Sequence, residues 1–505
     1  MSSEARPLTR ALVAFLLLVL VGTLWLFGAW SLGVRSPDFG WHLSTGRWIV
    51  EQGVVPRADP FCYTSQGLEW TNLNWLAQVG FYRVYQRFGF TGLEGLRLLL
   101  LSATLVFTWL NLRARRVPPV LGLVALGLSA WALLFVTALR PRLFTMALLS
   151  CFAWVLARPD PEDRLGVRAA LGLGALLLLW NQLHGGFVYG YCLLGADALG
   201  TAISSGRQGR GWLPLRSRWL GGVVALGLLS FLLHPHGLDA LWHVANYNAR
   251  LGPLVIAQTF ELMPLDFGTS LGRYFAACLA LATIGCVFGA RPRLREVLVA
   301  LPLLYLCLKM RRGVNPLVIV ALPWVAAAWI PLWAKGPARG LDRTFALAWR
   351  ALGLGLTLSA VCSAVVHLAL ASSPGQPNDV SDSAWRRELP VEAIAAIQRA
   401  GGQGRVFNRW PEGGPLVWGL YPSQRTFGDG RGDLHGTGTS VREGQEIAER
   451  RPGWHERLLA WEVEFALLER GTPLAEALAA RSEWRLIHED ATFVVLRREP
   501  EQRPR

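Results

Sequence analysis

The chain has 505 residues, of which 52% are hydrophobic and 17% are charged. Soluble proteins of this length carry a larger share of charge, so the composition excludes an ordinary soluble globular protein. Apolar runs recur at a length of about 20 residues, which crosses a hydrocarbon core of roughly 30 Å. The net charge of +15 is then expected in basic loops on one side of a membrane, and not in a nucleic-acid site. We therefore predict an α-helical polytopic membrane protein that binds no nucleic acid.

Hydropathy predicts about eleven membrane-spanning helices. The first apolar run is too long for a signal peptide and lacks a convincing cleavage site, so we expect it to be retained as a helix. The seven cysteines show neither a disulfide framework nor zinc spacing. The predicted spans lie near residues 11–34, 95–113, 118–138, 143–158, 168–183, 186–204, 218–233, 271–289, 295–309, 314–333 and 351–371.

The connecting segments predict the orientation. Arginine-rich segments fall on one side of the predicted spans, and such short basic loops stay in the cytoplasm. The N-terminus is then cytoplasmic, and the chain's end is periplasmic in a bacterial inner membrane. Lysine occurs only at Lys309 and Lys335, which we interpret as a compositional bias of a GC-rich bacterium. The basic segments are residues 1–10, 113–116, 158–168, 206–218, 290–295 and 334–343.

The opposite, outer segments hold the polar residues of greatest interest. Two arginine pairs there, Arg140 with Arg142 and Arg311 with Arg312, run against the charge trend. Cations on this side predict an anionic ligand, with anchoring to lipid headgroups as the alternative. Residues 74–90 are amphipathic and aromatic, which predicts a helix lying in the membrane interface. The outer segments are residues 35–94, 139–142, 181–186, 234–268 and 309–315.

The composition changes near residue 373, where a linker-like stretch begins. We predict a polytopic membrane domain over residues 1–372, with a large first outer loop at 35–94, and a small C-terminal soluble α/β domain over 373–505. The tail patterns predict a helix at 391–400, short strands at 405–408 and 425–430, a helical stretch at 442–470 interrupted at Pro452-Gly453, and two strands within 484–498.

The first outer loop reads PDFGWHLSTGRWIVEQGVVPRADPFCYTSQGLEWTNLNWL. It resembles the first loop of bacterial GT-C superfamily membrane glycosyltransferases, a group that includes protein O-mannosyltransferases, the lipid A aminoarabinose transferase and oligosaccharyltransferases. Relatives often have a glutamate where this chain has Asn74, so a role for that glutamate is not carried over. Further matches follow in order: RPRLF (140–144), NQLHGG (181–186), HPHG (234–237), ELMP (261–264), RRGVN (311–315) and residues 406–436.

The resemblance implies a polyprenyl-phosphate sugar donor, an inverting transfer to a lipid, polysaccharide or protein acceptor, and a catalytic aspartate in the first outer loop. Transfer to a hydroxyl requires a general base, and a carboxylate serves. Asp38 is the leading candidate, and a helix N-cap is its alternative. His42 lies four residues on and shares a helical face with Asp38, unless it makes a buried structural hydrogen bond. Asp59 could orient an acceptor or a divalent metal, or simply start an Asp-Pro turn.

The leaving lipid phosphate calls for cations, because guanidinium groups bind phosphate and stabilise its charge. Candidate substrate-binding residues have structural alternatives: His184 precedes a glycine turn, His234 flanks a helix-stopping proline, and Glu261 is placed to contact the sugar or cap a helix. The loop at 428–436 is expected to form a hairpin, with Asp429 and Arg431 near the acceptor path as the other reading. The full set of candidate substrate-binding residues is Arg140, Arg142, His184, His234, Glu261, Lys309, Arg311 and Arg312.

Two other classes of function remain open from the sequence. A transporter or flippase of a lipid-linked substrate would place ionisable residues inside several spans and repeat itself internally. Asp197 is the one clear acid inside a predicted span, and no repeat is evident. A non-catalytic envelope scaffold would use the tail to recruit partners.

Overall fold

The structure is a computed structural model that describes residues 36, 38–158, 165–336, isolated positions between 341 and 365, 390–436 and 439–499. The predicted first span, most of the predicted last span and the linker at 373–383 lie outside the described residues. The chain forms two compact units, and each is described by itself. The helical unit consists of Met1–Gly33, Glu94–His234 and Phe260–Leu370, and the mixed unit of Val34–Leu93, Pro235–Thr259 and Ala371–Arg505.

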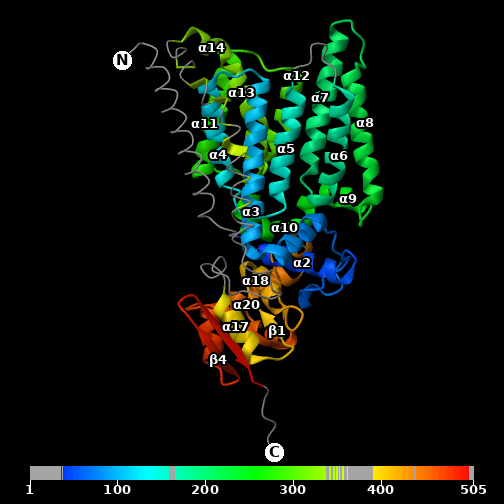
Figure 1. Ribbon diagram of the computed structural model, residues 1–505. Coiled ribbons are helices and arrows are strands. Elements are labelled where there is room, and N and C mark those ends of the chain that lie inside the picture. Colours follow the sequence, from blue (N-terminus) through cyan, green and yellow to red (C-terminus); the bar gives the residue numbers. More distant parts are fainter. Residues whose placement is uncertain are drawn as a thin grey trace, which may run out of the picture. The chain divides into compact units, whose positions relative to one another are not determined.

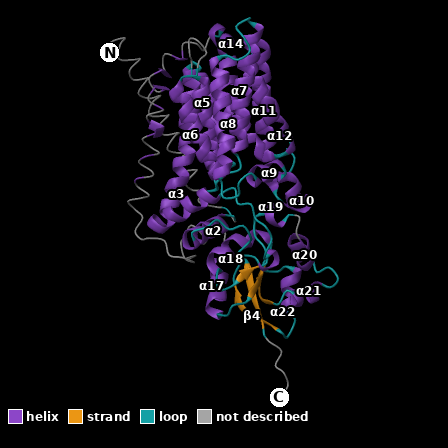
Figure 2. Ribbon diagram, turned by 90° about the vertical axis from the view of Figure 1, so that its right-hand side faces the viewer, coloured by secondary structure: helices purple, strands orange, loops and turns teal. Residues whose placement is uncertain are grey.

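The helices of the helical unit follow the predicted apolar runs, and their axes lie side by side in Figures 1 and 2. Five helices of the described chain are long and apolar enough to cross a membrane, and three shorter ones are apolar. The polytopic helical class is therefore supported, while the number of eleven spans stays a prediction. The helices are α3 (Trp75–Ala114), which belongs to this unit from Glu94 on, α4 (Pro119–Leu134), α5 (Arg142–Ala157), α6 (Val167–Leu183), α7 (Phe187–Arg207), α8 (Leu215–Leu229), α11 (Ser270–Phe288), α12 (Leu294–Lys309), α13 (Val314–Ala328) and α14 (Ile330–Lys335).

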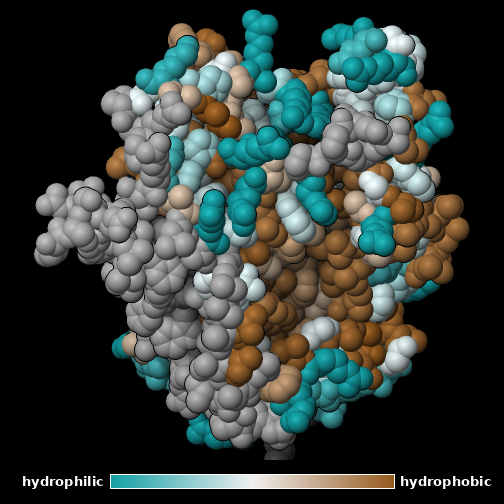
Figure 3. Space-filling model, turned by 45° about the horizontal axis from the view of Figure 1, so that its top comes forward, coloured by the Kyte–Doolittle hydropathy of each residue, from teal (hydrophilic) through white to brown (hydrophobic). Residues whose placement is uncertain are grey.

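The outer surface of these helices is apolar in a way that suits lipid. Large side chains such as Leu171, Leu229, Val287 and Phe288 are more than 60% exposed. Figure 3 shows hydrophobic residues spread over much of the visible face, with hydrophilic residues gathered toward the end that lies uppermost. Such extensive apolar exposure is rare in soluble proteins, and it is expected where hydrocarbon replaces water.

Short 3₁₀ turns end or connect several of these helices. Turn η2 (Ser230–Leu233) continues α8, while η3 (Phe260–Leu262) and η4 (Arg311–Gly313) precede α11 and α13. Helix α3 contains one non-helical residue, Gly89, with φ of 59°. The predicted helix at 74–90 is thus the first part of α3, up to this break, and its placement in the membrane interface stays a prediction.

The mixed unit contains a five-stranded sheet in the order β2-β1-β3-β5-β4. Strand β1 pairs in parallel with β2 and β3, whereas β5 pairs antiparallel with both β3 and β4. The helix predicted at 391–400 and the two strands predicted within 484–498 are confirmed. The strands are β1 (Arg405–Phe407), β2 (Arg425–Thr426), β3 (Val463–Glu469), β4 (Trp484–Glu489) and β5 (Phe493–Arg498).

Helices surround this sheet and extend the mixed unit into the first outer loop (Figure 2). Their apolar faces are buried with the strands, as in the cluster formed by Phe407, Ile447, Leu458, Leu478 and Leu496. The helices of the mixed unit are α2 (Phe39–Gln52), α9 (Asp239–Ala245), α10 (Tyr247–Gln258), α17 (Val391–Ala400), α18 (Gly413–Leu420), α19 (Gly432–His435), α20 (Thr439–Ala448), α21 (Trp454–Ala460) and α22 (Pro473–Ala479), with the 3₁₀ turns η1 (Tyr63–Ser65) and η6 (Trp410–Glu412).

The prediction of a helical stretch over 442–470 is wrong at its end. Helices α20 and α21 are present and separate at Pro452-Gly453 as expected, but residues 463–469 form β3. This strand pairs on both sides, and Val463 and residues 465–468 are buried. A short apolar run buried on both faces has no periodicity that separates strand from helix, so the tertiary pairing decides.

Helices α2 and α18 approach each other unusually closely. A Cβ added to Gly40 would overlap the backbone carbonyl of Gly414, far inside van der Waals contact. Both glycines are buried, and the lack of a side chain at each position lets the two backbones touch. This contact fixes the start of α2, where Asp38 lies.

We expect Gly40→Ala to destabilise the chain by roughly 1–3 kcal/mol, because the added methyl group must push the two helices apart. Gly80→Ala is the matched control, since a Cβ there meets no atom within 4 Å and alanine favours the helix by about 0.5–1 kcal/mol. Thermal unfolding of the purified full-length chain in detergent checks both variants. An unchanged midpoint for Gly40→Ala would contradict the close approach.

Candidate active site

Asp38 lies at the N-cap position of α2, immediately before its first residue, Phe39. It has helical dihedral angles, and its side chain makes no capping hydrogen bond to the helix. Its backbone N–H donates to Oγ of Ser36 at 3.2 Å. The alternative of a side-chain N-cap is therefore not realised, although the side chain lies at the positive end of the helix dipole, which favours the ionised carboxylate.

The loop at 428–436 lies directly against this carboxylate. A Cβ on Gly430 would overlap Oδ1 of Asp38 and come within 3.4 Å of Nε1 of Trp41. Only glycine therefore leaves room for the Asp38 side chain at this position. The expected hairpin is wrong, since residues 432–435 form the short helix α19, and the loop's glycines serve close packing around Asp38.

His42 is held inside the mixed unit by a defined hydrogen-bond chain. The amide Oε1 of Gln78 accepts from Nδ2 of Asn72 at 2.7 Å, so its Nε2 donates to Nδ1 of His42 at 3.1 Å. This assignment leaves the proton of neutral His42 on Nε2. The buried structural hydrogen bond expected as an alternative is present, and neither Asn72 nor Gln78 was singled out from the sequence.

Asp59 forms the centre of a buried turn and ion pair. Its carboxylate accepts from the backbone N–H groups of Phe61 and Cys62 at 2.9 and 3.3 Å. It also accepts from the Ser65 hydroxyl and, at 2.7 Å, from the guanidinium of Arg431. The turn alternative for Asp59 is thus realised, and its role in orienting an acceptor or a metal stays a prediction.

Arg431 is completely buried and carries the charge of this network. Besides Asp59 it binds Asp429 through Nε and Nη2, at 2.8 and 2.7 Å. Its guanidinium lies 4.6 Å from the ring centroid of Trp70 and 5.3 Å from that of Phe61. Burial raises the pKa of Asp429, but Arg431 and His435 outweigh it, so the pKa is lowered well below its usual value. Asp429 therefore stays ionised beside the guanidinium of Arg431.

Asp59, Cys62 and His435 bring potential ligand atoms within 4.8 Å of one another. The same space holds the guanidinium of Arg431, which contacts both Asp59 and Sγ of Cys62. Burial, with Asp429 next, raises the pKa of the Cys62 thiol well above its usual value, which disfavours the thiolate that binds metals. The chemistry of this donor set fits a buried ion pair better than a divalent cation.

Residues 235–259 are tied to the same loops. Nε2 of His243 lies 2.9 Å from Oδ2 of Asp433, and the backbone N–H of Asn72 donates to Nε2 of His236 at 3.1 Å. Burial, helped by Arg57 and by His243, lowers the pKa of His236 to about 4, so the ring is a neutral acceptor near pH 7. His236 of the HPHG turn thus has a structural role, because it holds the turn to the first outer loop.

In the helical unit, Glu261 bridges two of the predicted arginines. Oε2 of Glu261 accepts from Arg142 at 2.5 Å, and Oε1 lies 3.4 Å from Arg140. Burial raises the pKa of Glu261, but Arg142, Arg140 and Arg312 outweigh it, and the pKa is lowered to about 2. Glu261 therefore stays ionised among the positive charges of Arg142, Arg140 and Arg312.

His184 joins this cluster as a neutral donor. Its Nδ1 accepts from the backbone N–H of Gly186 at 2.9 Å, so Nε2 carries the proton. Nδ1 also lies 2.8 Å from Oγ1 of Thr145, which in turn accepts from Nε1 of Trp180. Burial, followed by the charges of Arg312 and Arg142, lowers the pKa of His184 to about 3. The imidazole is therefore uncharged at neutral pH.

The remaining candidates have different surroundings. Arg311 is buried, donates from Nε to the carbonyl of Pro264 at 3.1 Å, and lies 4.1 Å from the ring centroid of Phe260. Lys309 is exposed in the last turn of α12, and His234 is buried at the end of η2. The structure thus brings Arg140, Arg142, His184, Glu261 and Arg312 together in the helical unit, and Asp38, His42 and Asp59 within the mixed unit.

Comparison with known proteins shows what this architecture resembles. No family model matches the sequence, and no curated protein matches it. Among solved structures, the oligosaccharyltransferase of Archaeoglobus fulgidus in its apo form matches with a TM-score of 0.56 and 13% identity, covering 92% of this chain and 70% of that one. The A. fulgidus oligosaccharyltransferase AglB, in complex with an inhibitory peptide and a dolichol-phosphate, matches with a TM-score of 0.50 and 12% identity, covering 97% and 75%.

These structures belong to GT-C glycosyltransferases. The chain has the GT-C fold. A weaker likeness, with a TM-score of 0.47, is found to ArnT from Cupriavidus metallidurans. The resemblance predicted from the first outer loop and the order of the later motifs is thus confirmed at the level of the fold.

Within this GT-C fold, the one acid noted inside a predicted span already has a partner. Asp197 of α7 accepts from Nε and Nη2 of Arg216 at 2.6 and 3.1 Å, and both side chains are buried. Arg295 lies 3.6 Å away and adds a second positive charge. The charge of Asp197 is therefore neutralised within the helical unit, which removes the observation that favoured a transporter.

Arg431→Met should destabilise the chain by roughly 3–5 kcal/mol, because it leaves Asp59 and Asp429 buried without their cation. Arg470→Met is the control: the pair of Arg470 with Glu489 is 57% and 42% exposed, so its loss costs about 0–1 kcal/mol. Thermal unfolding of the full-length chain in detergent separates the two cases. Equal midpoints for the two variants would show that the buried network is not a main source of stability.

Proposed function

We propose that the protein is a membrane glycosyltransferase that moves a sugar from a polyprenyl-phosphate donor to an envelope acceptor on the periplasmic face. The GT-C fold carries this proposal, because it is shared with an oligosaccharyltransferase whose structure contains an inhibitory peptide and a dolichol-phosphate. The chemistry of the two polar sites supports it. A lipid, a polysaccharide or a protein can supply the accepting hydroxyl.

The reaction needs a base at the acceptor. The acceptor oxygen attacks the anomeric carbon of the sugar, the bond from that carbon to the phosphate oxygen breaks, and the hydroxyl proton must leave. Asp38 takes this proton in our proposal, since its carboxylate is half-buried at the start of α2 and is not used as a helix cap. A single displacement of this kind inverts the anomeric configuration.

The reaction also needs positive charge at the leaving group. The departing lipid phosphate gains negative charge as the bond to the sugar breaks, and guanidinium groups stabilise that charge through paired hydrogen bonds. Arg142 and Arg140 provide these groups, with Arg312 nearby, and Glu261 holds them in place. His184 is neutral and carries its proton on Nε2, so it can donate a hydrogen bond without adding charge.

The remaining predicted residues support the site in this proposal. His42 fixes the first turns of α2 through Gln78, and Asp59 holds the first loop to Arg431. Arg311, Lys309 and His234 would line the approach of the lipid phosphate. A divalent metal stays a candidate cofactor, and its binding would need carboxylates other than those committed to Arg431.

Asp38→Asn should abolish transfer, a loss of about 10²–10⁴-fold in rate, because the amide cannot accept the hydroxyl proton. The measurement first identifies the glycan or glycolipid that disappears from the envelope of a deletion strain. The strain is then complemented with each variant, and the amount of this product and the level of the protein are measured. Glu51→Gln, which changes an exposed carboxylate of the same helix, should restore the product fully. Full restoration of the product by Asp38→Asn would contradict the assignment of Asp38 as the base.

Arg142→Gln should weaken binding of a polyprenyl phosphate at least tenfold, because a charge-assisted hydrogen bond is worth about 1.5–3 kcal/mol. Titration of the purified chain with undecaprenyl phosphate, followed by native mass spectrometry, gives the affinity. Arg273→Gln is the matched control: Arg273 is exposed near the start of α11 and donates to the carbonyl of Gly268. Equal affinities for both variants would place the lipid phosphate elsewhere.

A further inference from the structure

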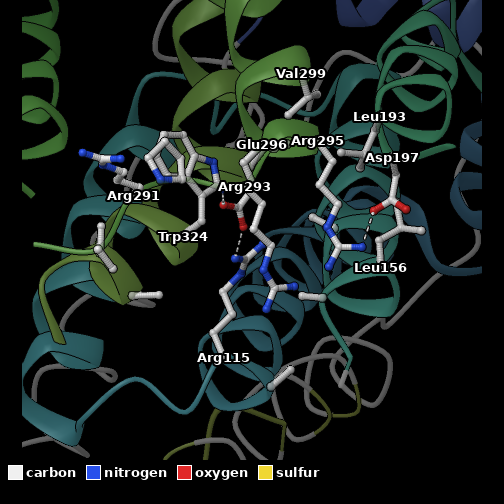
Figure 4. A pocket seen from close by; sticks show the side chains of 18 of the residues that line it. Arg115, Leu156, Leu193, Asp197, Arg291, Arg293, Arg295, Glu296, Val299 and Trp324 are labelled. Carbon is white, nitrogen blue, oxygen red and sulfur yellow. Dashed lines mark hydrogen bonds and ion pairs between the residues drawn. The ribbon is translucent and has the colours of Figure 1, made fainter. Parts of the chain in front are cut away.

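A second polar site lies at the other end of the helical unit. It is a cavity of about 470 Å³ formed where α3, α5 and α13 end and α12 begins (Figure 4). Helix α5 makes the separation clear: Arg142 of the Glu261 cluster is its first residue, and Ala157 of this cavity is its last. Sixteen helical residues span about 24 Å, so the two sites are distinct.

Five arginines and two carboxylates line this cavity. Two of the arginines pair with the carboxylates: Arg115 with Glu296, and Arg295 with Asp197 (Figure 4). Asp197 is also bound by Arg216 from outside the lining. Among the described residues, none forms an ion pair with the guanidinium groups of the other three arginines. These three are Arg116, Arg291 and Arg293.

The cavity also holds an unused hydrogen-bond donor. The indole Nε1–H of Trp324, on α13, is buried and has no partner in the described part of the chain. A buried donor without an acceptor costs about 1–3 kcal/mol. An oxyanion in the cavity would satisfy this donor while neutralising the excess positive charge.

The surface beside the cavity suits a lipid. Val287 and Phe288 end α11 immediately before the cavity wall at 290–293, and they are 66% and 71% exposed. An acyl chain could cover these side chains while its phosphate reaches the arginines. Basic pockets between membrane helices on the cytoplasmic side bind lipid headgroups in this way, and the loops here are those that the charge pattern places in the cytoplasm.

We propose that this cavity binds the phosphate group of an anionic membrane lipid. Guanidinium groups from the loops after α3 and α11 hold the phosphate oxygens, and Trp324 donates one further hydrogen bond. The site lies apart from the proposed transfer chemistry, and its role is to fix the helical unit to one leaflet. The shared chemistry is a phosphate group, which a lipid or a soluble anion could provide.

The test is a titration of the full-length chain in detergent with phosphatidylglycerol, and with phosphatidylcholine for comparison, read by native mass spectrometry. Phosphatidylglycerol should bind more tightly than phosphatidylcholine. The double variant Arg291→Gln/Arg293→Gln should weaken the binding of phosphatidylglycerol at least tenfold, because two charge-assisted contacts are lost. The matched control is Arg207→Gln/Arg210→Gln, which removes two exposed charges from a basic loop outside the cavity. The control should change the affinity less than twofold.

Trp324→Phe gives a second, independent variant, since it keeps an aromatic ring and removes the indole N–H together with the five-membered ring. This variant should weaken the binding of phosphatidylglycerol about threefold to tenfold. Equal weakening by both double variants, or equal binding of the two lipids, would overturn the proposal. A calorimetric titration with inorganic phosphate distinguishes a lipid from a soluble anion as the ligand. Binding of inorganic phosphate that depends on Arg291 and Arg293 would assign the cavity to a soluble anion and overturn the proposed lipid site. None of these measurements depends on sugar transfer.

Discussion

The buried guanidinium of Arg431 is the constraint on which the mixed unit depends. A charge fully removed from water is tolerated only with opposite charges close beside it. Asp59 comes from the first outer loop and Asp429 from the tail, so neutralising Arg431 requires both segments, 370 residues apart in the sequence, to meet. Once they meet, Gly430 must lie against Asp38. The position of the proposed base is therefore a consequence of a charge that is not itself part of the chemistry.

The arginines of the helical unit follow the opposite arrangement. Arg140 and Arg142 are each about one-fifth exposed, and both bind Glu261. Arg431, by contrast, is completely buried with Asp59 and Asp429. A guanidinium enclosed with its carboxylates forms a permanent structural link, whereas a guanidinium that stays partly accessible can bind a further anion. This difference in exposure, and not the mere presence of arginine, separates the binding candidates from the structural ones.

The sequence was sufficient for features that depend on local pattern. Apolar runs predicted the helices α4 to α8 and α11 to α13, and the order of loop motifs indicated the GT-C fold. It failed where distant pairing decides: residues 463–469 are a strand because β1 and β5 lie on either side. The same holds in the site, because no spacing indicates that Gln78 orients His42 or that Arg431 neutralises Asp59. Such partners come together through tertiary contacts, and the segments that carry them have no fixed separation in the sequence.

The preference for arginine over lysine, interpreted from composition as a bias without chemistry, has physical consequences in this fold. A lysine buried at the position of Arg97 or Arg216 could lose its proton, but a guanidinium cannot, so a carboxylate beside each of these two arginines compensates its charge. Glu94 meets this need for Arg97 and Asp197 for Arg216. Where arginines outnumber the carboxylates among the described residues, as at the cavity beside Trp324, further negative charge can come from outside the chain. An arginine-rich membrane protein therefore indicates its anion sites by its shortage of acids.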